Sequence, residues 1–314
     1  MEPVAESVQV LHVAERNLMI VQEAFERFIM KRKLKNLAPK TISNYICFVT
    51  PFINYIGSSL DVEFLDTDLV LNYISTLYDR TLADASRATY MRHIKTFLRW
   101  MKDCYNIPVS LTEIELPKTP KKLVRILSDD DVKHLFDCVT CESEWLTMRN
   151  RAIIALMLGS GLRQNEVATL QWKNIYISQN YAIVRGKGNK ERCVPLGSIV
   201  SRFLEEYRRI CPYEDTYVFM GRRGTPITNN TIKKMVQKLK SKSGIDISSH
   251  GMRHNFATNY CIDSLENSGQ CDAYTLQSLM GHEDVKTTEK YMHYAKSLIA
   301  SKNSRSHLDM VFGA

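Results

Sequence analysis

The residues of this sequence best suited to chemistry are arginines, histidines and a tyrosine in its C-terminal half. Arg163 follows the glycine-containing stretch GSGL, which predicts a tight turn before a helix. His250 and Arg253 stand three residues apart in HGMRH, so on a helix their side chains share one face. His282 precedes Tyr291 by nine residues. Any one of these residues alone is more often structural than catalytic, so the prediction depends on the set.

This set suits an attack on a phosphodiester. A phosphodiester under attack gains negative charge on its non-bridging oxygens. Arg163 and Arg253 can neutralise that charge with bidentate hydrogen bonds, and His282 can donate one more. The positive charge would then come from side chains at the place where other enzymes use Mg²⁺.

Proton transfers complete the predicted reaction. The hydroxyl of Tyr291 has an ordinary pKa of about 10 and needs a base, for which His250 is the candidate. The departing 5′ oxygen needs a proton, which Lys187 on a predicted hairpin tip can supply. A phosphotyrosine keeps the energy of the phosphodiester, so religation needs no nucleotide cofactor.

Motifs for metals and nucleotides are absent from the sequence. No acidic cluster in it suggests a two-metal nuclease, it has no GxxxxGK[ST] loop, and GKGNK lies between predicted strands. Cys138 and Cys141 have CxxC spacing with His134 upstream, but a structural zinc site needs about four ligands and no second pair accompanies them. We expect no metal, no cofactor and reduced cysteines.

These residues must be positioned by helices and strands, and the sequence patterns predict a mainly α fold with a small antiparallel β-sheet. Residues 15–108 show helical periodicity and predict a helical N-terminal domain. Residues 109–127 contain prolines and lysines and predict a basic linker. Residues 128–300 predict a mixed α+β catalytic domain, in which NIYI, YAIVR and ERCVPL are the strands. An extension, 1–14, and a tail, 301–314, flank these parts.

Composition and charge are compatible with a DNA-binding enzyme. Hydrophobic residues make up 44% of the 314 residues and charged residues 24%, an ordinary composition for about two globular domains. The net charge of +8 fits a polyanionic partner without identifying one. The sequence has no apolar run of about 18 residues and no signal-peptide pattern at its N-terminus. We therefore expect a cytoplasmic protein associated with the nucleoid.

Basic side chains outside the reactive set are expected to position the protein on DNA through phosphate contacts, which makes binding dependent on salt. Several lie on the exposed face of a helix over residues 85–105, and others lie in the linker, beside the hairpin or on a later helix. The expected contacts are Arg87, Arg92, Lys95, Lys121, Lys122, Lys190, Arg192, Lys233, Lys234 and Lys238.

Four motifs in order, GLRQNEVATLQW, VRGKGNKERCVPLG, SHGMRHNFAT and LMGHEDVKTTEKYMH, resemble the tyrosine recombinase (phage integrase) family. The likeness is greatest to simple two-domain Xer-type recombinases and transposon-encoded integrases, and it covers residues 15–300. It implies two domains that clamp duplex DNA carrying inverted-repeat core sites. It also implies cutting and rejoining through a 3′-phosphotyrosyl intermediate and a Holliday junction, by a homotetramer or by a heterotetramer with a related recombinase.

The resemblance also implies a role for each motif residue. Glu166 would be a supporting acid that orients the arginines. Tyr294 is a rival nucleophile, but the family places a histidine two residues after its tyrosine, and His293 selects Tyr291. The implied catalytic set is Arg163, Lys187, His250, Arg253, His282 and the nucleophile Tyr291.

The sequence departs from the family pattern in two places, at residues 261–274 and at its N-terminus. Residues 261–274 lengthen the stretch between Arg253 and His282. This loop either adjusts subunit contacts or is a tolerated surface insertion, and we favour the insertion. The apolar end of the tail either folds back on its own domain or, as the resemblance implies, docks on a neighbouring protomer. Residues 1–14 are too few for the separate arm-binding domain of some integrases.

Two other functions remain open at this point. A degenerate recombinase could serve as a non-catalytic DNA-binding or architectural protein. A type IB topoisomerase shares the chemistry but relaxes supercoils without a partner site. The sequence does not distinguish integration, excision and resolution of a mobile or circular DNA element.

Overall fold

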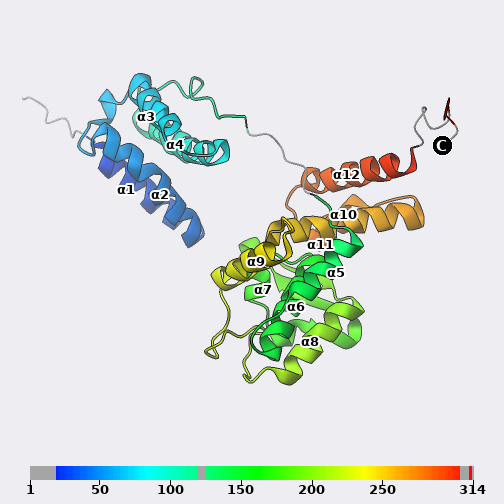
Figure 1. Ribbon diagram of the computed structural model, residues 1–314. Helices are drawn as coiled ribbons and strands as arrows, with labels where there is room; N and C mark the ends of the chain where they lie inside the picture. Colours follow the sequence, from blue (N-terminus) through cyan, green and yellow to red (C-terminus); the bar gives the residue numbers. More distant parts are fainter. Residues whose placement is uncertain (1–18, 119–124, 305–310, 313–314) are drawn as a thin grey trace, which may run out of the picture. The chain divides into compact units, whose positions relative to one another are not determined.

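The computed structural model describes residues 19–118, 125–304 and 311–312. The chain divides into two compact units, Met1–Lys122 and Leu123–Ala314. Within the described residues helices predominate, and β1, β2 and β3 form a single three-stranded antiparallel sheet (Figure 1). The predicted fold class is therefore confirmed. Lys121 and Lys122, which we expected to contact DNA, lie outside the described residues.

The described part of the first unit is built from helices around an aromatic core. Pro39 occupies the first turn of the second helix, where its missing N–H costs nothing. The buried ring of Phe28 makes edge contacts with Tyr45, Phe97 and Trp100 at centroid distances of 5.0, 5.3 and 5.4 Å. The helices are α1 (Val21–Leu34), α2 (Pro39–Ile56), α3 (Thr67–Asp79) and α4 (Asp84–Tyr105).

The second unit contains the small sheet and most of the remaining helices. Its three strands are those that the alternating patterns predict. They are β1 (Ile175–Tyr176), β2 (Tyr181–Arg185) and β3 (Glu191–Pro195). Its α-helices are α5 (Asp129–Cys138), α6 (Glu144–Gly159), α7 (Gln164–Ala168), α8 (Ser198–Ile210), α9 (Asn229–Ser243), α10 (Ser249–Ser268), α11 (Ala273–Met280) and α12 (Val285–Asn303).

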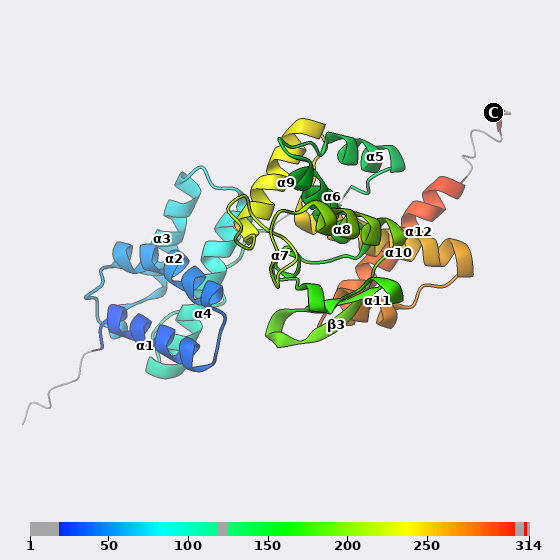
Figure 2. The same ribbon diagram turned by 90° about the horizontal axis from the view of Figure 1, so that it is seen from below.

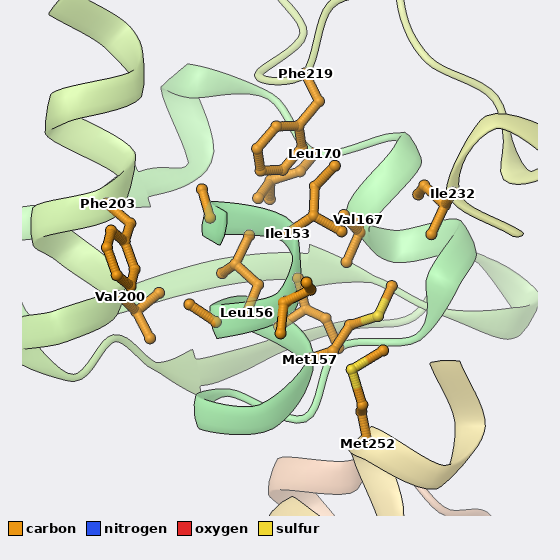
Figure 3. Close-up of a cluster of buried hydrophobic side chains, with 14 of the residues drawn as sticks. Ile153, Leu156, Met157, Val167, Leu170, Val200, Phe203, Phe219, Ile232 and Met252 are labelled. Atoms are coloured by element: carbon orange, nitrogen blue, oxygen red, sulfur yellow. The ribbon is translucent and has the colours of Figure 1, made fainter. Parts of the chain in front are cut away.

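Helix α6 lies at the centre of the second unit and packs against both α8 and α10. Its residues Ile153, Leu156 and Met157 are almost completely buried, and full burial of such a side chain contributes about 1.5–3 kcal/mol. A helix held on several sides is a rigid support for the turn that follows it. Figure 3 shows these side chains among Val167, Leu170, Val200, Phe203, Phe219, Ile232 and Met252.

The segment 261–274, interpreted above as an inserted loop, is mainly helical. Its first eight residues are the last two turns of α10, which ends at the left-handed Gly269. Asp272 then caps α11 by accepting hydrogen bonds from two backbone N–H groups of its first turn. Cys261 packs in a small apolar cluster with residues of α11 and α12. The prediction of a loop was wrong because the helical pattern continues through this segment.

Helix α10 lies beside α12 in both views, and the two helices pack against each other (Figures 1 and 2). Most of the tail, 301–314, lies outside the described residues, so the question of its docking stays a prediction. In the part of the chain that the structure describes, no helix has the length and apolar character needed to span a bilayer.

The turn between α6 and α7 gives the first testable prediction. Gly161 has a φ of +66°, and a Cβ on it would lie 2.4 Å from the ring of Phe256. Gly161→Ala should lower the free energy of unfolding of this unit by about 2–4 kcal/mol, measured by urea denaturation. Gly244→Ala is the matched control, because its φ is +71° but no atom lies within 4 Å of the added Cβ. Equal losses in the two variants would show that the Phe256 contact is unimportant.

Candidate active site

The candidate site begins at the turn between α6 and α7. Arg163 is the residue before α7, and its backbone N–H donates to Glu166 Oε2 at 2.7 Å. Its guanidinium donates from Nη1 to Glu166 Oε1 at 2.9 Å. Leu162 is fully buried directly before Arg163, so the turn fixes where this guanidinium begins. The local sequence GLRQNE thus places an arginine and its acid together.

Glu166 also binds an arginine from the sheet. Arg192 on β3 donates from Nη1 and Nη2 to the two carboxylate oxygens at 2.6 and 2.8 Å. Burial alone would raise the pKa of Glu166, but the hydrogen bonds and charges of Arg192 and Arg163 lower it below its ordinary value. The carboxylate is therefore ionised and joins the α6–α7 turn to the sheet.

The end of α11 supplies the other acceptors of the arginines. A helix C-terminus leaves carbonyls without intrahelical partners and carries partial negative charge. Gly281 ends α11 in the left-handed conformation, and a Cβ there would lie 3.0 Å from Arg192 Cδ. Arg192 Nε donates to the carbonyl of Leu279 (2.7 Å), Arg253 Nη2 donates to that of Met280, and Arg163 Nη2 donates to that of Gly281 (2.8 Å).

Arg253 lies under this network on α10, and its side chain is almost completely buried. Its Nη1 donates to the carbonyl of Gly161 at 2.5 Å and lies 4.0 Å from Glu166 Oε2. Burial lowers the pKa of Arg253 to about 9, as does the charge of Arg163, while Glu166 raises it. The guanidinium thus stays charged at neutral pH. Three guanidiniums share this one carboxylate, so the site has an excess of positive charge.

Two histidines of α10 contact each other, and one of them contacts the tyrosine. His250 Nε2 lies 2.6 Å from His254 Nε2, so one ring donates and the other accepts. The ring of His254 in turn lies 5.1 Å from that of Tyr291, between centroids. Burial lowers the pKa of His254 to about 4, helped by the charges of His250 and Arg253. His254 was missed by the sequence analysis, although it directly follows Arg253 in HGMRH.

Tyr291 on α12 is 7% exposed and lies between two imidazoles. The ring of His282 is nearly parallel to it, at 15° and 6.0 Å. Burial raises the pKa of the Tyr291 phenol, and the charges of Arg253 and Arg163 partly offset the rise. Tyr294, the rival nucleophile, is half-buried one turn further along α12. Among the described residues, ring contacts connect His254 and His282 to Tyr291.

His282 follows Gly281 and is oriented by a buried hydroxyl. Its Nδ1 lies 3.0 Å from Thr288 Oγ1, and Thr288 is completely buried. Burial and the charges of Arg253 and Arg163 lower the pKa of His282 to about 4, so the ring is neutral at pH 7. When the threonine hydroxyl donates to Nδ1, Nε2 carries the proton and can donate a hydrogen bond. A cavity of about 380 Å³ beside the ring is also lined by Arg163, Lys190 and Tyr274.

The other predicted site residues differ in how far the structure describes them and in what they contact. The backbone of Lys187 begins a 3₁₀ turn between β2 and β3, and its side chain lies outside what the structure describes. Arg192, expected to contact DNA, is instead 9% exposed and committed to Glu166 and α11.

The remaining expected DNA contacts also differ from one another. Arg87 pairs with Asp84 at 2.5 Å, and Lys95 donates to the carbonyl of Ile114 at 2.8 Å, so both are engaged within their own unit. The exposed ones are Arg92, Lys190, Lys233, Lys234 and Lys238.

The CxxC motif joins no metal-binding group in the described ranges. Cys138 Sγ lies 3.7 Å from His134 Nε2, and Asn150 Nδ2 donates to Cys141 Sγ at 3.1 Å. No cluster of three or more His, Cys, Asp or Glu residues suited to holding a metal ion occurs among the residues described.

Comparison with known proteins identifies the class. The fold is mostly helical with a small sheet, and a cationic pocket beside His282 lies next to the buried Tyr291. Residues 125–297 match the model of the Phage integrase family, and the chain belongs to this family. The predicted membership and enzyme class, a tyrosine-type DNA recombinase, are confirmed.

Relatives resemble the chain over most of its length. Tyrosine recombinase XerC of Pediococcus pentosaceus is 30% identical over 276 residues, which cover 83% of this chain and 90% of that protein. Tyrosine recombinase XerD of Listeria innocua is 28% identical over 275 residues, with coverage of 83% and 90%.

Solved structures share the fold. XerH recombinase bound to a palindromic difH substrate has a TM-score of 0.69 and 20% identity, covering 90% of this chain and 83% of that chain. A lambda integrase dimer bound to a COC′ core site has a TM-score of 0.70 and 16% identity, with coverage of 88% and 78%.

Removal of the Glu166 charge tests the arginine network. Glu166→Gln should lower the free energy of unfolding by about 3–5 kcal/mol, because it leaves buried guanidiniums without their counter-charge. The matched control, Glu191→Gln, breaks the exposed pair with Arg185 and should cost less than about 1 kcal/mol.

The loss of stability in the same variant should depend on pH, and the lowered pKa of Glu166 gives the sign of this dependence. A lowered folded-state pKa stabilises the protein above the ordinary value of 4.5, and this contribution is lost as the pH falls through the folded value. The stability difference between wild type and Glu166→Gln should therefore narrow below pH 4.5. A constant difference would show that the Glu166 charge is not what stabilises the site.

Proposed function

We propose that this recombinase cuts and rejoins duplex DNA through a covalent bond between Tyr291 and a 3′ phosphate. The observation that carries the proposal is the placement of Tyr291 against His254 and His282, next to Arg253 and Arg163. A phosphate attacked there would meet two guanidiniums and a neutral imidazole that can donate. Such preorganised donors stabilise the charge that develops on the phosphoryl oxygens.

The reaction balances without a nucleotide cofactor. The Tyr291 oxygen forms a bond to phosphorus, the bond from phosphorus to the 5′ oxygen breaks, and a 5′ hydroxyl leaves. The phenol proton goes to the pair His250 and His254, whose short N–N contact lets one imidazole pass a proton to the other. Lys187 is proposed to protonate the leaving oxygen, as expected from its hairpin. Reversal of these steps on another strand rejoins the DNA.

Family membership supports a proposal for the larger assembly. We propose that two pairs of subunits on inverted-repeat core sites exchange strands through a Holliday junction, with the first unit as the core-binding domain and the second as the catalytic domain. A lambda integrase tetramer bound to a Holliday junction has the same fold at a TM-score of 0.69. The element served is proposed to be a mobile or circular DNA, in the cytoplasm and associated with the nucleoid.

The nucleophile can be tested directly. Tyr291→Phe should abolish the covalent protein–DNA complex, measured on nicked duplexes selected from a library of inverted repeats for binding to the protein. Tyr294→Phe is the matched control and should form the complex, because the histidine contacts belong to Tyr291. Cleavage in wild type should be unchanged by EDTA.

Other outcomes would indicate a different function or a different nucleophile. Binding without any covalent product in wild type would indicate a non-catalytic DNA-binding protein. Relaxation of any supercoiled plasmid by a monomer would indicate a topoisomerase. Complex formation by Tyr291→Phe would contradict the assigned nucleophile.

The imidazole pair makes a separate prediction. The pKa values of His250 and His254 are both lowered, His254 to about 4, so the pair is a neutral base at pH 7. Because only the neutral form accepts a proton, the single-turnover cleavage rate should hold as the pH falls through 6.5 and decline only at lower pH. His254→Asn should slow cleavage by about 10²-fold at pH 7 while DNA binding is unchanged. His134 is an exposed histidine on α5, and the control variant His134→Asn should cleave at the wild-type rate. A wild-type cleavage rate in His254→Asn would exclude the proposed proton path through His254.

A further inference from the structure

A second pocket of the C-terminal unit lies at the opposite end of α6 from Arg163. It is formed where the end of α5 and the first turns of α6 meet α9, which lie close together in both views (Figures 1 and 2). Its volume is about 200 Å³. None of its lining residues belongs to the site around Tyr291, and the proposed reaction does not use it.

The walls of this pocket are rich in positive charge. Lys234, Lys238 and Lys242 recur every fourth residue along α9, so they share one face of the helix and line the pocket together. Arg222 lines it as well and pairs with Glu142 at 2.8 Å. No aspartate or glutamate is among the described lining residues.

The fifth cation, Arg149, is unlike the others because it is 7% exposed. Its Nη1 donates to the carbonyl of Met220 at 2.8 Å, and its Nε and Nη2 donate to Asn150 Oδ1 at 3.1 and 2.9 Å. These bonds use three of the five N–H groups of a guanidinium. The described residues place no carboxylate within ion-pair distance of it, and burial lowers the pKa of Arg149.

A buried charge without a counter-charge is costly, and proteins pair such charges or place them where an ion binds. Arg149 is held by neutral acceptors alone, and the remaining wall of the pocket is cationic. A bound anion would supply the missing charge. A guanidinium with free N–H groups, surrounded by flexible ammonium groups, suits a tetrahedral oxyanion with several acceptor oxygens.

We propose that this pocket binds a phosphate group, with Arg149 as its buried contact and Lys234, Lys238 and Lys242 as its exposed contacts. The phosphate belongs either to a free polyphosphate, such as a nucleotide, or to the backbone of DNA that lies beyond the cleavage site. Both sources present the same chemistry to the pocket. The proposal does not depend on strand cleavage, since it shares no residue with the Tyr291 site.

The first experiment measures inorganic pyrophosphate binding to the full chain by isothermal titration calorimetry. Lys238→Gln should weaken binding about tenfold, the usual loss for one charge-assisted hydrogen bond. Lys240→Gln is the matched control, because it removes an equal charge from α9 but pairs with Asp246 and does not line the pocket. It should bind within about twofold of wild type. Pyrophosphate bound beside Tyr291 would be insensitive to either substitution.

The second experiment locates the ligand without mutating the chain. Cys138 and Cys141 line the pocket and are half-buried, whereas Cys193 on β3 is exposed elsewhere. Pyrophosphate should slow iodoacetamide labelling of Cys138 and Cys141, followed by mass spectrometry, and should leave the labelling of Cys193 unchanged. Equal protection of all three thiols, or of none, would overturn the assignment.

A competition experiment distinguishes the two sources. If saturating duplex DNA excludes pyrophosphate and Lys238→Gln weakens the binding of DNA more than Lys240→Gln does, the phosphate comes from the DNA backbone. If pyrophosphate binds equally with and without DNA, the pocket serves a free phosphorylated ligand. Both outcomes support a phosphate site. Absence of pyrophosphate binding, or equal losses in Lys238→Gln and Lys240→Gln, would overturn it, whatever the result of the cleavage assays.

Discussion

The contact between the Glu166 carboxylate and the arginines around it is the interaction on which the candidate site depends. Glu166 comes from α7, Arg192 from the sheet and Arg253 from α10, so one buried acid joins elements that are distant in sequence. The same guanidiniums cover the carbonyls at the end of α11. Because α11 leads directly to His282, this network also sets the place of the second imidazole. A single change at Glu166 therefore affects every part of the site.

The network is unbalanced in charge, which has a chemical consequence. Three guanidiniums meet one carboxylate and several carbonyls, so the folded protein holds positive charge that its own residues only partly neutralise. Holding such charges in place costs stability in the free protein. An anionic phosphate would relieve that cost, and more so as its oxygens gain charge during attack. The burial that raises the pKa of Tyr291 belongs to the same arrangement, because a desolvated phenol needs a neighbouring base to react.

Local patterns in the sequence predicted the parts of the site that depend on neighbours along the chain. The glycine turn before Arg163 and the three-residue spacing of His250 and Arg253 needed only helix and turn rules. The role of Arg192 could not be found in this way, because its partner Glu166 is 26 residues away and an arginine beside a hairpin is equally suited to DNA. His254 had a signal, since it shares a helix face with His250. The contacts of Tyr291 depend on how α10 and α12 pack, which no local pattern specifies.

The fold was predictable to a similar extent, and α8 shows the limit. Its buried residues Val200, Phe203, Leu204 and Tyr207 have helical spacing, so the signal was present and was not used. The helical part of 261–274 was missed because polar residues obscured the continuing pattern.

Arg163 and Arg253 differ in their exposure to solvent, and this difference suits them to different roles. The Arg163 side chain is 35% exposed, and its bonds to Glu166 and Gly281 leave N–H groups for a ligand. Arg253 is 3% exposed and donates to the carbonyls of Gly161 and Met280. In the proposed reaction Arg163 would therefore meet the phosphate at the surface of the site. Arg253 would act from below, where low exposure to water strengthens the effect of its charge on both the phosphate and the Tyr291 phenol.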